Sequence, residues 1–350
     1  MILKYERQRA RIRFIVVFLH PNILDMKRIL GVGNALVDVI VQLPDESLLK
    51  SFDLPKGGME MIDIERKRNL HAAISTMKQK LASGGSTSNT IHGLARLGAP
   101  TGYIGKVGND EMSAFFENDM KKSGIRPHLV HTSDLDTGIA TTLMTQDAER
   151  TFATYLGAAA SMSPEEIDNE IFKDYDCIHV EGYLIFNHDL ILEICKKAKA
   201  NGLKISMDMA SFNLVKEHHD FVEMLLRDYV DILFANEDEA GAFTGKSGEE
   251  SLDILSQYCE TCVVKLGKHG SVANVKGQKA RIRTSGVKAI DTNGAGDAYA
   301  AGFLYGLLNQ FTPEKTLHLA ARIADEMIVT TGAKLSDEQW EKIRNEKELF

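Results

Sequence analysis

The sequence has few of the residues that mark several large classes of protein. Among its 350 residues there are only 4 cysteines and one tryptophan. Four scattered cysteines are too few for a disulfide framework, so we expect a reducing, cytoplasmic location. Internal repeats, low-complexity tracts and linkers are also lacking, which favours one main domain.

An excess of basic residues is absent as well. The formal net charge is −8, which argues against nucleic acid or an anionic membrane as the main partner. Any phosphate site must therefore be local. With 44% hydrophobic and 26% charged residues, the chain has an ordinary globular composition and is long enough for a large α/β domain with a minor appendage.

Long hydrophobic runs are missing too. The 25 residues before Met26 are basic and then briefly apolar at Phe14–Leu19. That run is too short to span a bilayer, and no small-residue cleavage site follows it. A strand-like segment begins directly after Met26, so we interpret residues 1–25 as an extension outside the fold.

Two short patterns resemble functional motifs without completing them. Cys259 and Cys262 have the spacing of a metal or redox pair, but no second pair exists, so we do not expect zinc or redox chemistry. Gly31 and Gly33 resemble the start of a dinucleotide fingerprint. Because Leu36 occupies the place of the third glycine, the pattern disfavours a dehydrogenase.

The segment Ala240–Ser247 fits a relaxed P-loop pattern. A true P-loop runs from a strand into a helix, whereas this segment follows a helical pattern that begins near Asn236 and ends at Gly245. We interpret it as the C-terminal end of a helix, and a P-loop is the alternative.

Apolar segments of strand length alternate with amphipathic segments, which is typical of a mainly parallel sheet covered by helices. The expected strands are Arg28–Val32, Thr101–Gly105, Cys177–Val180, Lys204–Met207, Asp231–Phe234 and Cys262–Leu266. The clearest helical period covers residues 187–201 and ends at Gly202. Residues 39–61 and 137–155 predict short strands and turns with little helix.

The most informative stretch is Asp291–Phe303, which reads Asp-Thr-Asn-Gly-Ala-Gly-Asp-Ala-Tyr-Ala-Ala-Gly-Phe. Gly294, Ala295 and Gly296 have little or no side chain, so several backbone N–H groups can converge on an anion at the positive end of the following helix. Asp297 then lies within reach of an attacking hydroxyl and can accept its proton as a general base. The alternative is a simple loop, with Asp297 favoured at a helix start by the dipole.

A second glycine-rich segment begins at Gly84 and is followed by Tyr103–Asp110. Together with Asp291–Phe303, it resembles the two signatures of the PfkB carbohydrate kinase family, which includes ribokinase, fructokinase and adenosine kinase. The resemblance extends from about Met26 to about Leu335 in the family's order. The other matching motifs are Gly31–Asp38, Asn236–Glu239 and Lys265–Gly270.

The resemblance implies that residues 26–350 form one kinase domain of the ribokinase-like α/β class. That class has a mainly parallel sheet flanked by helices, with a small β-sheet lid, here inserted at about 39–61 and 137–155. It also implies transfer of the γ-phosphate of ATP to a hydroxymethyl group of a nucleoside or sugar, with Mg²⁺ as the metal cofactor. We expect a small-molecule partner, neither nucleic acid nor membrane, and a monomer or a homodimer.

On the acceptor side, the resemblance assigns sugar contacts to five residues. Asn34 and Asp38 match the pair that hydrogen-bonds sugar hydroxyls, and a capped turn after a strand is the alternative. Gly84 and Gly85 match a di-glycine hinge that permits lid closure, and glycines that merely begin a helix are the alternative. Asn89 matches a position that usually contacts the sugar.

On the nucleotide side, Asn236 and Glu239 match the family's Asn-x-x-Glu motif, which organises Mg²⁺ and its waters around the phosphates. An acidic helix start is the alternative. Lys265, Gly267 and Gly270 belong to a loop that resembles the one bordering ATP, where glycines allow the backbone to approach the nucleotide.

Three further assignments rest on the resemblance. Asn293, in the second signature, is expected to contact the nucleotide. Arg150 aligns with an arginine thought to reach the transferred phosphate in adenosine kinases, and an ordinary exposed lid arginine is the alternative. Asp291 matches a position used for potassium in ribokinase, so K⁺ is the additional cofactor that this match allows.

The particular residues within these motifs favour a nucleoside acceptor. Gly84–Asn89, Gly33–Asp38 and Asp291–Asp297 resemble adenosine kinases more than ribokinases. Tyr183 could stack on a nucleobase, and a core tyrosine after a strand is the alternative. We therefore expect phosphorylation of adenosine to AMP, a purine salvage reaction. A ribokinase- or fructokinase-type sugar kinase is the first alternative, and an inactive nucleoside-binding protein is the second.

Overall fold

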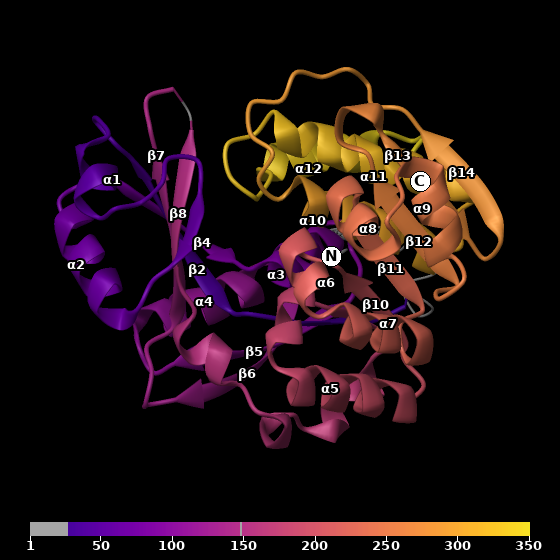
Figure 1. The fold of residues 1–350 in the computed structure, drawn as a ribbon, viewed down its shortest axis with the longest axis horizontal. Coiled ribbons are helices and arrows are strands. Elements are labelled where there is room, and N and C mark those ends of the chain that lie inside the picture. Colours follow the sequence, from indigo (N-terminus) through magenta and orange to yellow (C-terminus); the bar gives the residue numbers. More distant parts are fainter. Residues whose placement is uncertain (1–26, 148) are drawn as a thin grey trace, which may run out of the picture.

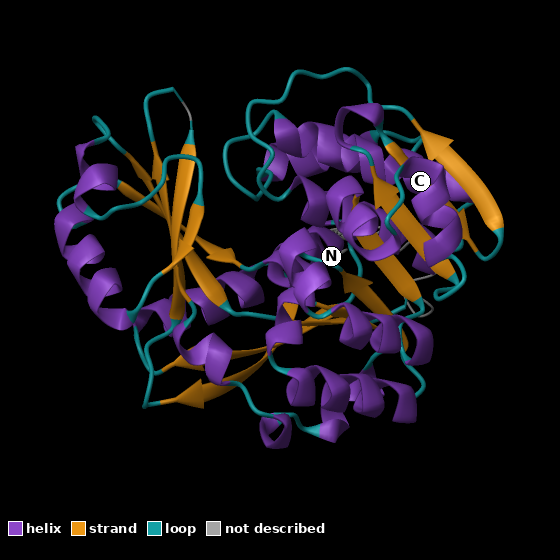
Figure 2. Ribbon diagram, in the orientation of Figure 1, coloured by secondary structure: helices purple, strands orange, loops and turns teal. Residues whose placement is uncertain are grey.

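The strands of the computed structural model, which describes residues 27–147 and 149–350, form two separate sheets (Figures 1 and 2). The extension expected at residues 1–25 lies outside the described residues. The large sheet has the order β14 (Gln278–Ile282), β13 (Ser271–Val275), β12 (Thr261–Lys265), β11 (Ile232–Asn236), β10 (Lys204–Asp208), β9 (Cys177–Val180), β1 (Ile29–Val32), β5 (Thr101–Gly108), β6 (Ile125–Thr132). The small sheet has the order β3 (Met59–Met61), β8 (Arg150–Tyr155), β7 (Gly138–Met144), β2 (Leu36–Gln42), β4 (Gln79–Gly84).

The large sheet is mainly parallel, as the sequence predicts. All neighbouring strands from β12 to β6 run in the same direction, and only the pairs that involve β13 are antiparallel. Each of the six expected strands is present, with ends that differ by three residues or fewer. The central strands are buried on both faces, which explains why their apolar runs are continuous: the neighbours Ile29 and Leu30 belong to two different core clusters.

Helices cover both faces of the large sheet. The described residues contain the α-helices α1 (Ser47–Ser51), α2 (Ile64–Ile74), α3 (Ser86–Arg96), α4 (Glu111–Lys122), α5 (His188–Ala200), α6 (Phe212–Glu217), α7 (His219–Asp228), α8 (Glu237–Thr244), α9 (Gly248–Leu255), α10 (Ala295–Leu308), α11 (Pro313–Ile328) and α12 (Asp337–Asn345), of which α3 to α11 cover the large sheet. One core cluster contains side chains of α5 to α9, and the other contains side chains of α3, α4, α10 and α11. The helix predicted at residues 187–201 is α5, and Asn187 caps it by accepting a hydrogen bond from the backbone N–H of Leu190 at 3.1 Å.

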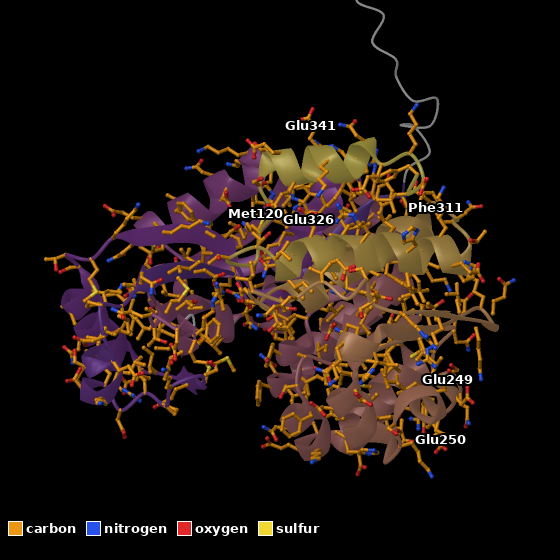
Figure 3. The ribbon with its side chains drawn as sticks, turned by 90° about the horizontal axis from the view of Figure 1, so that it is seen from above. Met120, Glu249, Glu250, Phe311, Glu326 and Glu341 are labelled. Atoms are coloured by element: carbon orange, nitrogen blue, oxygen red, sulfur yellow. The ribbon has the colours of Figure 1, made fainter. Side chains whose placement is uncertain are left out.

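Helix α12 lies outside these layers and packs against α11 (Figure 3). Glu326 of α11 accepts hydrogen bonds from Gln339 of α12 at 3.2 Å and from Arg322 at 2.8 Å. Trp340 of α12 is buried in a third core cluster together with Ala298 of α10. The C-terminal helix therefore supports the start of α10.

The small sheet stands to one side of the large sheet, with α1 and α2 on its outer side (Figure 1). Val37, Val39 and Val41 of β2 are buried in the same core cluster as residues of α2, while the alternate residues face the other way. Strand β4 and helix α2 lie beyond the expected insertions, and α1 interrupts the first of them. Besides the five-residue α1, the structure has no helix in residues 39–61, so the expectation of little helix is confirmed there.

The structure also shows the local surroundings of two of the short motif-like patterns. Helix α8 ends at Gly245, which has the left-handed φ of +69° that favours glycine, so the P-loop alternative is wrong. Cys259 and Cys262 are both buried, and the Cys262 thiol donates to the Cys259 carbonyl at 3.6 Å. Within the part of the chain that the structure describes, no helix is long and apolar enough to cross a membrane.

Candidate active site

A group of polar residues stands where the central strands of the large sheet end. Asn34 and Glu181 follow β1 and β9, while Asp208, Asn236 and Lys265 are the last residues of β10, β11 and β12. Because the carboxyl ends of parallel strands share one edge of a sheet, these residues lie along that edge. Ligands of open α/β sheets bind there, so this edge is the candidate active site.

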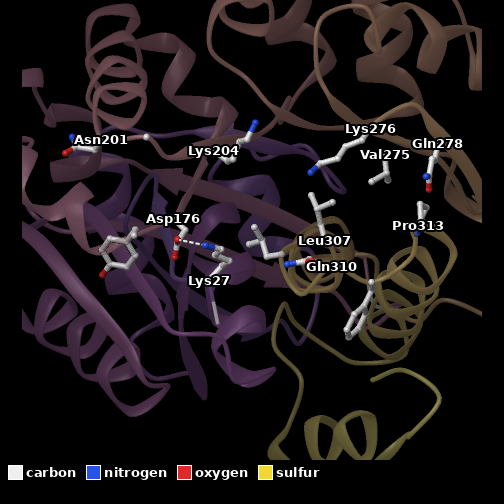
Figure 4. Close-up of a pocket in the computed structure, with 14 residues that line it drawn as sticks. Lys27, Asp176, Asn201, Lys204, Val275, Lys276, Gln278, Leu307, Gln310 and Pro313 are labelled. Atoms are coloured by element: carbon white, nitrogen blue, oxygen red, sulfur yellow. Dashed lines mark hydrogen bonds and ion pairs between the residues drawn. The ribbon is translucent and has the colours of Figure 1, made fainter. Parts of the chain in front are cut away.

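A cavity of about 710 Å³ lies at the opposite edge (Figure 4). It is lined by Lys27, Asp176 and Lys204, which stand at the amino ends of their strands. Lys27 and Asp176 form an ion pair at 3.0 Å. No residue predicted to bind substrate or nucleotide lines this cavity, so its size does not locate the active site.

Asp297 joins the two glycine-rich segments. It lies in the first turn of α10, and its carboxylate accepts hydrogen bonds from Ser86 Oγ at 2.7 Å and Asn89 Nδ2 at 3.0 Å on α3. Burial raises the pKa of Asp297 to about 6, although these two hydrogen bonds lower it. Gly294 begins the helix with φ of +72°, and a Cβ there would lie 2.7 Å from the Cβ of Ala333. Asn89 thus has Asp297 as a partner in the structure, and its expected contact with the sugar remains a prediction.

The amides expected to bind an anion differ from the prediction in one respect. The N–H of Ala295 donates to the carbonyl of Thr292 at 3.2 Å, so the turn already uses it. For the next two amides, those of Gly296 and Asp297, the described part of the chain supplies no acceptor. These two N–H groups point from the positive end of α10 and can bind a phosphoryl oxygen.

Asp38 lies on strand β2 of the small sheet, not in a turn after β1, so the capped-turn alternative is wrong. Its carboxylate packs against Gly84, where a Cβ would be 2.2 Å from Asp38 Oδ1. Gly85 has φ of +95°, and a Cβ there would lie 2.3 Å from the Asn34 carbonyl. Both glycines are thus required by close approach. Burial raises the pKa of Asp38 to about 6.

Glu181 is a buried carboxylate that the sequence did not single out. It accepts hydrogen bonds from the backbone N–H of Asn34 at 3.3 Å, the Asn34 side chain at 2.6 Å and the N–H of Thr87 at 3.2 Å. Burial nevertheless raises its pKa to about 7. A Cβ on Gly33 would lie 2.4 Å from Glu181 Oε2. Glu181 therefore fixes the loop after β1, and it also occupies the Asn34 amide expected to bind a sugar.

Tyr183 follows Glu181 in a short 3-10 turn, Gly182–Phe186, and is half-buried. Burial, and then the charge of Glu181, raise the pKa of the Tyr183 hydroxyl to about 12. The ring therefore lies beside the carboxylates of the site. Its stacking on a base remains a prediction.

Asn236 and Glu239 bind each other as a capping box at the start of α8. Glu239 accepts from the backbone and side-chain N–H groups of Asn236, both at 2.8 Å, and its own N–H donates to Asn236 Oδ1 at 2.8 Å. Glu239 therefore does act as an acidic residue that caps a helix start, as the alternative interpretation expects. Glu239 is also only 4% exposed, and burial, with the neighbouring Asp208, raises its pKa to about 7. An ordinary surface cap would not be buried beside a second carboxylate.

Lys265 supplies a positive charge next to Asp208 and Glu239, on the side of the site where the nucleotide is expected. Its Nζ is 2.8 Å from Asp208, a residue that the sequence did not predict, and would lie 3.3 Å from a Cβ on Gly296. Burial lowers the pKa of Lys265, but Asp208 and Glu239 outweigh it and hold that pKa above its usual range. The ammonium therefore stands beside the free amides at the start of α10.

The two glycines after Lys265 have different surroundings. Gly267 has φ of +51° with open space where a Cβ would be. Gly270 has φ of +93°, and a Cβ there would lie 2.0 Å from the carbonyl of Ile282 on β14. Packing within the sheet is thus enough to require glycine at position 270, and nucleotide contact at both positions remains a prediction.

Arg150 and Asp291 form an ion pair of 2.6 Å between the small sheet and the loop before α10. Their side chains are only 9% and 8% exposed, so the alternative of an ordinary exposed lid arginine is wrong. Asp291 also accepts from the N–H groups of Gly332 at 2.7 Å and Asn293 at 3.0 Å. A potassium ion at Asp291 would therefore have to compete with a buried guanidinium.

The sequence pattern of the pfkB family carbohydrate kinases matches residues 53–340. The chain is 27% identical to a 5-dehydro-2-deoxygluconokinase of Bacillus subtilis, over 74% of this chain and 85% of that protein. It is 27% identical to adenosine kinase of Saccharomyces cerevisiae, over 88% and 96% of the two chains. The crystal structure of adenosine kinase from Sinorhizobium meliloti superposes with a TM-score of 0.80 at 30% identity, covering 91% and 99%.

The comparisons and the residues of the site both indicate a phosphoryl transfer reaction. The matched range contains both glycine-rich segments, which Asp297 joins in the structure. The named relatives are kinases with two different acceptors, and the dehydrogenase alternative finds no support among them. The chain is a member of the PfkB family of carbohydrate kinases, and its activity is ATP-dependent phosphoryl transfer.

Proposed function

We propose that this kinase transfers the γ-phosphate of ATP to the 5′-hydroxyl of adenosine, yielding AMP. The proposal rests on one observation, the negative charge of Asp38 where the acceptor is expected to bind. Among the described residues, the carboxylate of Asp38 forms no ion pair: Lys334 and Arg150 are near enough to lower its pKa, but Arg150 is paired with Asp291 and Lys334 with Asp119 at 2.7 Å.

This charge distribution favours an uncharged acceptor. An ionised carboxylate accepts charge-assisted hydrogen bonds from vicinal hydroxyls, such as the 2′- and 3′-hydroxyls of a ribose. A gluconate-type acceptor carries its own carboxylate, which Asp38 and Asp297 would repel. The proposal therefore follows the relatives named adenosine kinase over those named 5-dehydro-2-deoxygluconokinase.

The face of the small sheet that carries Asp38 also carries apolar side chains. In the strand register, Asp38, Ala140, Thr154 and Met61 are successive partners, so they share this face. Met61 is 52% exposed, and Met59, two residues earlier on the same strand and face, is 59% exposed. Met59 and Met61 lie on β3, three strands from Asp38 on the same face. An apolar surface on this face suits a nucleobase, whereas free ribose or fructose has no group to cover it.

The residues of this chain divide the proposed reaction between them. Asp297 takes the proton of the attacking hydroxyl, and Ser86 and Asn89 orient it. Lys265 and the amides of Gly296 and Asp297 stabilise the negative charge of the transferred phosphoryl group.

The donor set near the nucleotide also fits magnesium. Glu239 is a buried carboxylate whose pKa is raised, and the half-buried carboxylate of Asp208 is its neighbour, so a further positive charge there would stabilise the ionised form of Glu239. Mg²⁺ prefers oxygen ligands and keeps most of its waters, so we assign its indirect binding to Glu239. When bound, the ion would neutralise charge on the phosphate oxygens.

Glu239→Gln separates this metal role from helix capping. Glutamine at the same position of a capping box can still accept from Asn236, so the melting temperature should change little. The loss of charge should raise the magnesium concentration needed for half-maximal activity and lower kcat. A magnesium titration that matches the wild type, together with a lowered melting temperature in Glu239→Ala, would leave Glu239 as a helix cap only.

The pH dependence of kcat/KM for the acceptor should reflect the ionisation of both Asp297 and Asp38. Burial raises both pKa values to about 6, so each group is protonated below that pH and ionised above it. Base action and hydroxyl binding both need the ionised form. We therefore expect kcat/KM for the acceptor to be constant above about pH 7 and to fall through pH 6 more steeply than for one group. An acidic limb near pH 4 would contradict this.

The proposed acceptor can be tested directly. A thermal-shift and ADP-release screen should include adenosine, other nucleosides, ribose, fructose and sugar phosphates, with ATP and Mg²⁺. The proposal expects turnover with adenosine. Efficient turnover of a sugar instead would support the sugar kinase alternative, and binding of adenosine without ADP release would support an inactive nucleoside-binding protein.

A further inference from the structure

A second charged cluster lies beside Gly84 and joins three distant parts of the chain. Lys334, in the loop after α11, donates to Asp119 Oδ2 on α4 at 2.7 Å and to the hydroxyl of Ser83 on β4. The same carboxylate oxygen accepts from the Ser83 backbone N–H at 3.3 Å and from the Ser83 hydroxyl. Both the backbone and the side chain of Ser83 are thereby held.

This cluster is connected to the proposed acceptor site through the neighbouring glycine. Ser83 is fully buried and directly precedes Gly84, against which the carboxylate of Asp38 packs. In the register of the small sheet, Ser83 pairs with Val37, the residue before Asp38. The position of Ser83 therefore determines both the end of β4 and the place of Asp38.

The charges that act on Asp38 come from three elements. Burial is the main effect and raises its pKa. Lys334 is the strongest influence that favours the ionised form, followed by Arg150 of β8, while Asp297 of α10 opposes ionisation. Removing the ammonium of Lys334 would therefore move the titration of Asp38 to higher pH.

We propose that Lys334, held by Asp119 and Ser83, is a positioning residue for the acceptor: it fixes the strand end before Gly84 and places a positive charge beside Asp38. The proposal rests on the kinase function proposed for the same site. The side chains of Lys334 and Asp119 are 17% and 30% exposed, and a partly exposed ion pair contributes little net stability, so a merely structural tie would not need these charges. No motif of the family resemblance assigned Lys334 or Asp119.

Lys334→Met tests the proposal because it keeps the length of the side chain and removes the charge. The KM for adenosine should rise at least about tenfold at pH 7, which corresponds to about 1.4 kcal/mol, while the KM for ATP stays within about twofold. The acidic limb of kcat/KM for adenosine should move to higher pH. Hydrogen exchange of backbone amides in residues 79–86 should become faster.

Two further variants separate the parts of this inference. Asp119→Asn keeps the ammonium but weakens the hold on Ser83, so amide exchange in residues 79–86 should rise without the upward move of the acidic limb. Lys106→Met is the matched control, because Lys106 is also buried and pairs with Glu166 at 2.7 Å, away from Asp38. It should lower stability without changing exchange in residues 79–86.

The outcomes distinguish this inference from the proposed function. Unchanged KM for adenosine, an unmoved acidic limb and unchanged exchange in Lys334→Met would overturn the role of Lys334. A wild-type protein that phosphorylates none of the tested acceptors would instead refute the proposed function. In that case the exchange of residues 79–86 still decides whether Lys334 fixes the strand end, because it is measured without substrate.

Discussion

Asp297→Asn is expected to lower kcat by about 10² to 10⁴, the usual effect of losing a general base. Asparagine has nearly the same size, so the contacts of α10 with α3 should survive. The amides of Gly296 and of residue 297 belong to the backbone, and the ammonium of Lys265 is untouched. ATP affinity should therefore change by no more than a few-fold.

The measurement is steady-state turnover together with nucleotide binding by calorimetry. Asp189→Asn is a matched control, because Asp189 also lies in the first turn of a helix, α5, but is exposed and outside the site. That control should keep wild-type kcat, since a helix-start carboxylate contributes only about 0.3–1 kcal/mol of stability. Turnover of Asp297→Asn within twofold of wild type would remove Asp297 from the mechanism.

The second large effect concerns the hydroxyls of the acceptor. Wild-type enzyme should use 2′-deoxyadenosine at least about tenfold less efficiently than adenosine in kcat/KM. The reason is that a charge-assisted hydrogen bond contributes about 1.5–3 kcal/mol, and the missing hydroxyl leaves the half-buried Asp38 partly unpaired.

Asp38→Ala should narrow this difference, because the group that distinguishes the two nucleosides is gone. Asp136→Ala is a suitable control: Asp136 pairs with Lys67 at 2.9 Å next to the small sheet, and its removal should leave the preference intact. An equal preference in wild type and Asp38→Ala would show that Asp38 does not contact these hydroxyls.

The fold could be predicted where burial dictates the sequence. Strands covered by helices on both faces are continuous apolar runs, so all six expected strands of the large sheet are present. Of the missed strands, β4, β6 and β14 lie at sheet edges, where solvent allows polar residues: β4 begins with Gln79 and Lys80, and β6 contains Pro127. Strand β13, which lies between β12 and β14, was missed as well.

The site was predictable only in part. Glycine motifs indicated Asp297, Gly84 and Gly85, because close packing and positive φ leave a signal in the sequence. Their partners leave no such signal: Glu181 and Asp208 are single carboxylates after ordinary strands. Only the parallel order of the strands brings these residues to one edge.

Side-chain partners were the least predictable feature. Asn89 and Arg150 were expected to contact sugar and phosphate, and these contacts remain predictions; their side-chain partners in the structure, Asp297 and Asp291, were not foreseen. Lys334 is separated from Ser83 by 251 residues, so no local pattern could connect them. Contacts of this kind depend on tertiary packing and can only be read from the structure.

The central claim is tested most directly by competition for limiting ATP. Adenosine, ribose, fructose and 5-dehydro-2-deoxygluconate would be supplied at equal concentration with Mg²⁺, and the products identified by mass spectrometry. We predict that AMP exceeds each sugar phosphate by at least about tenfold, because the acceptor side offers an unpaired carboxylate and an apolar sheet face. A phosphorylated sugar or sugar acid as the main product, with adenosine unchanged, would contradict the proposal.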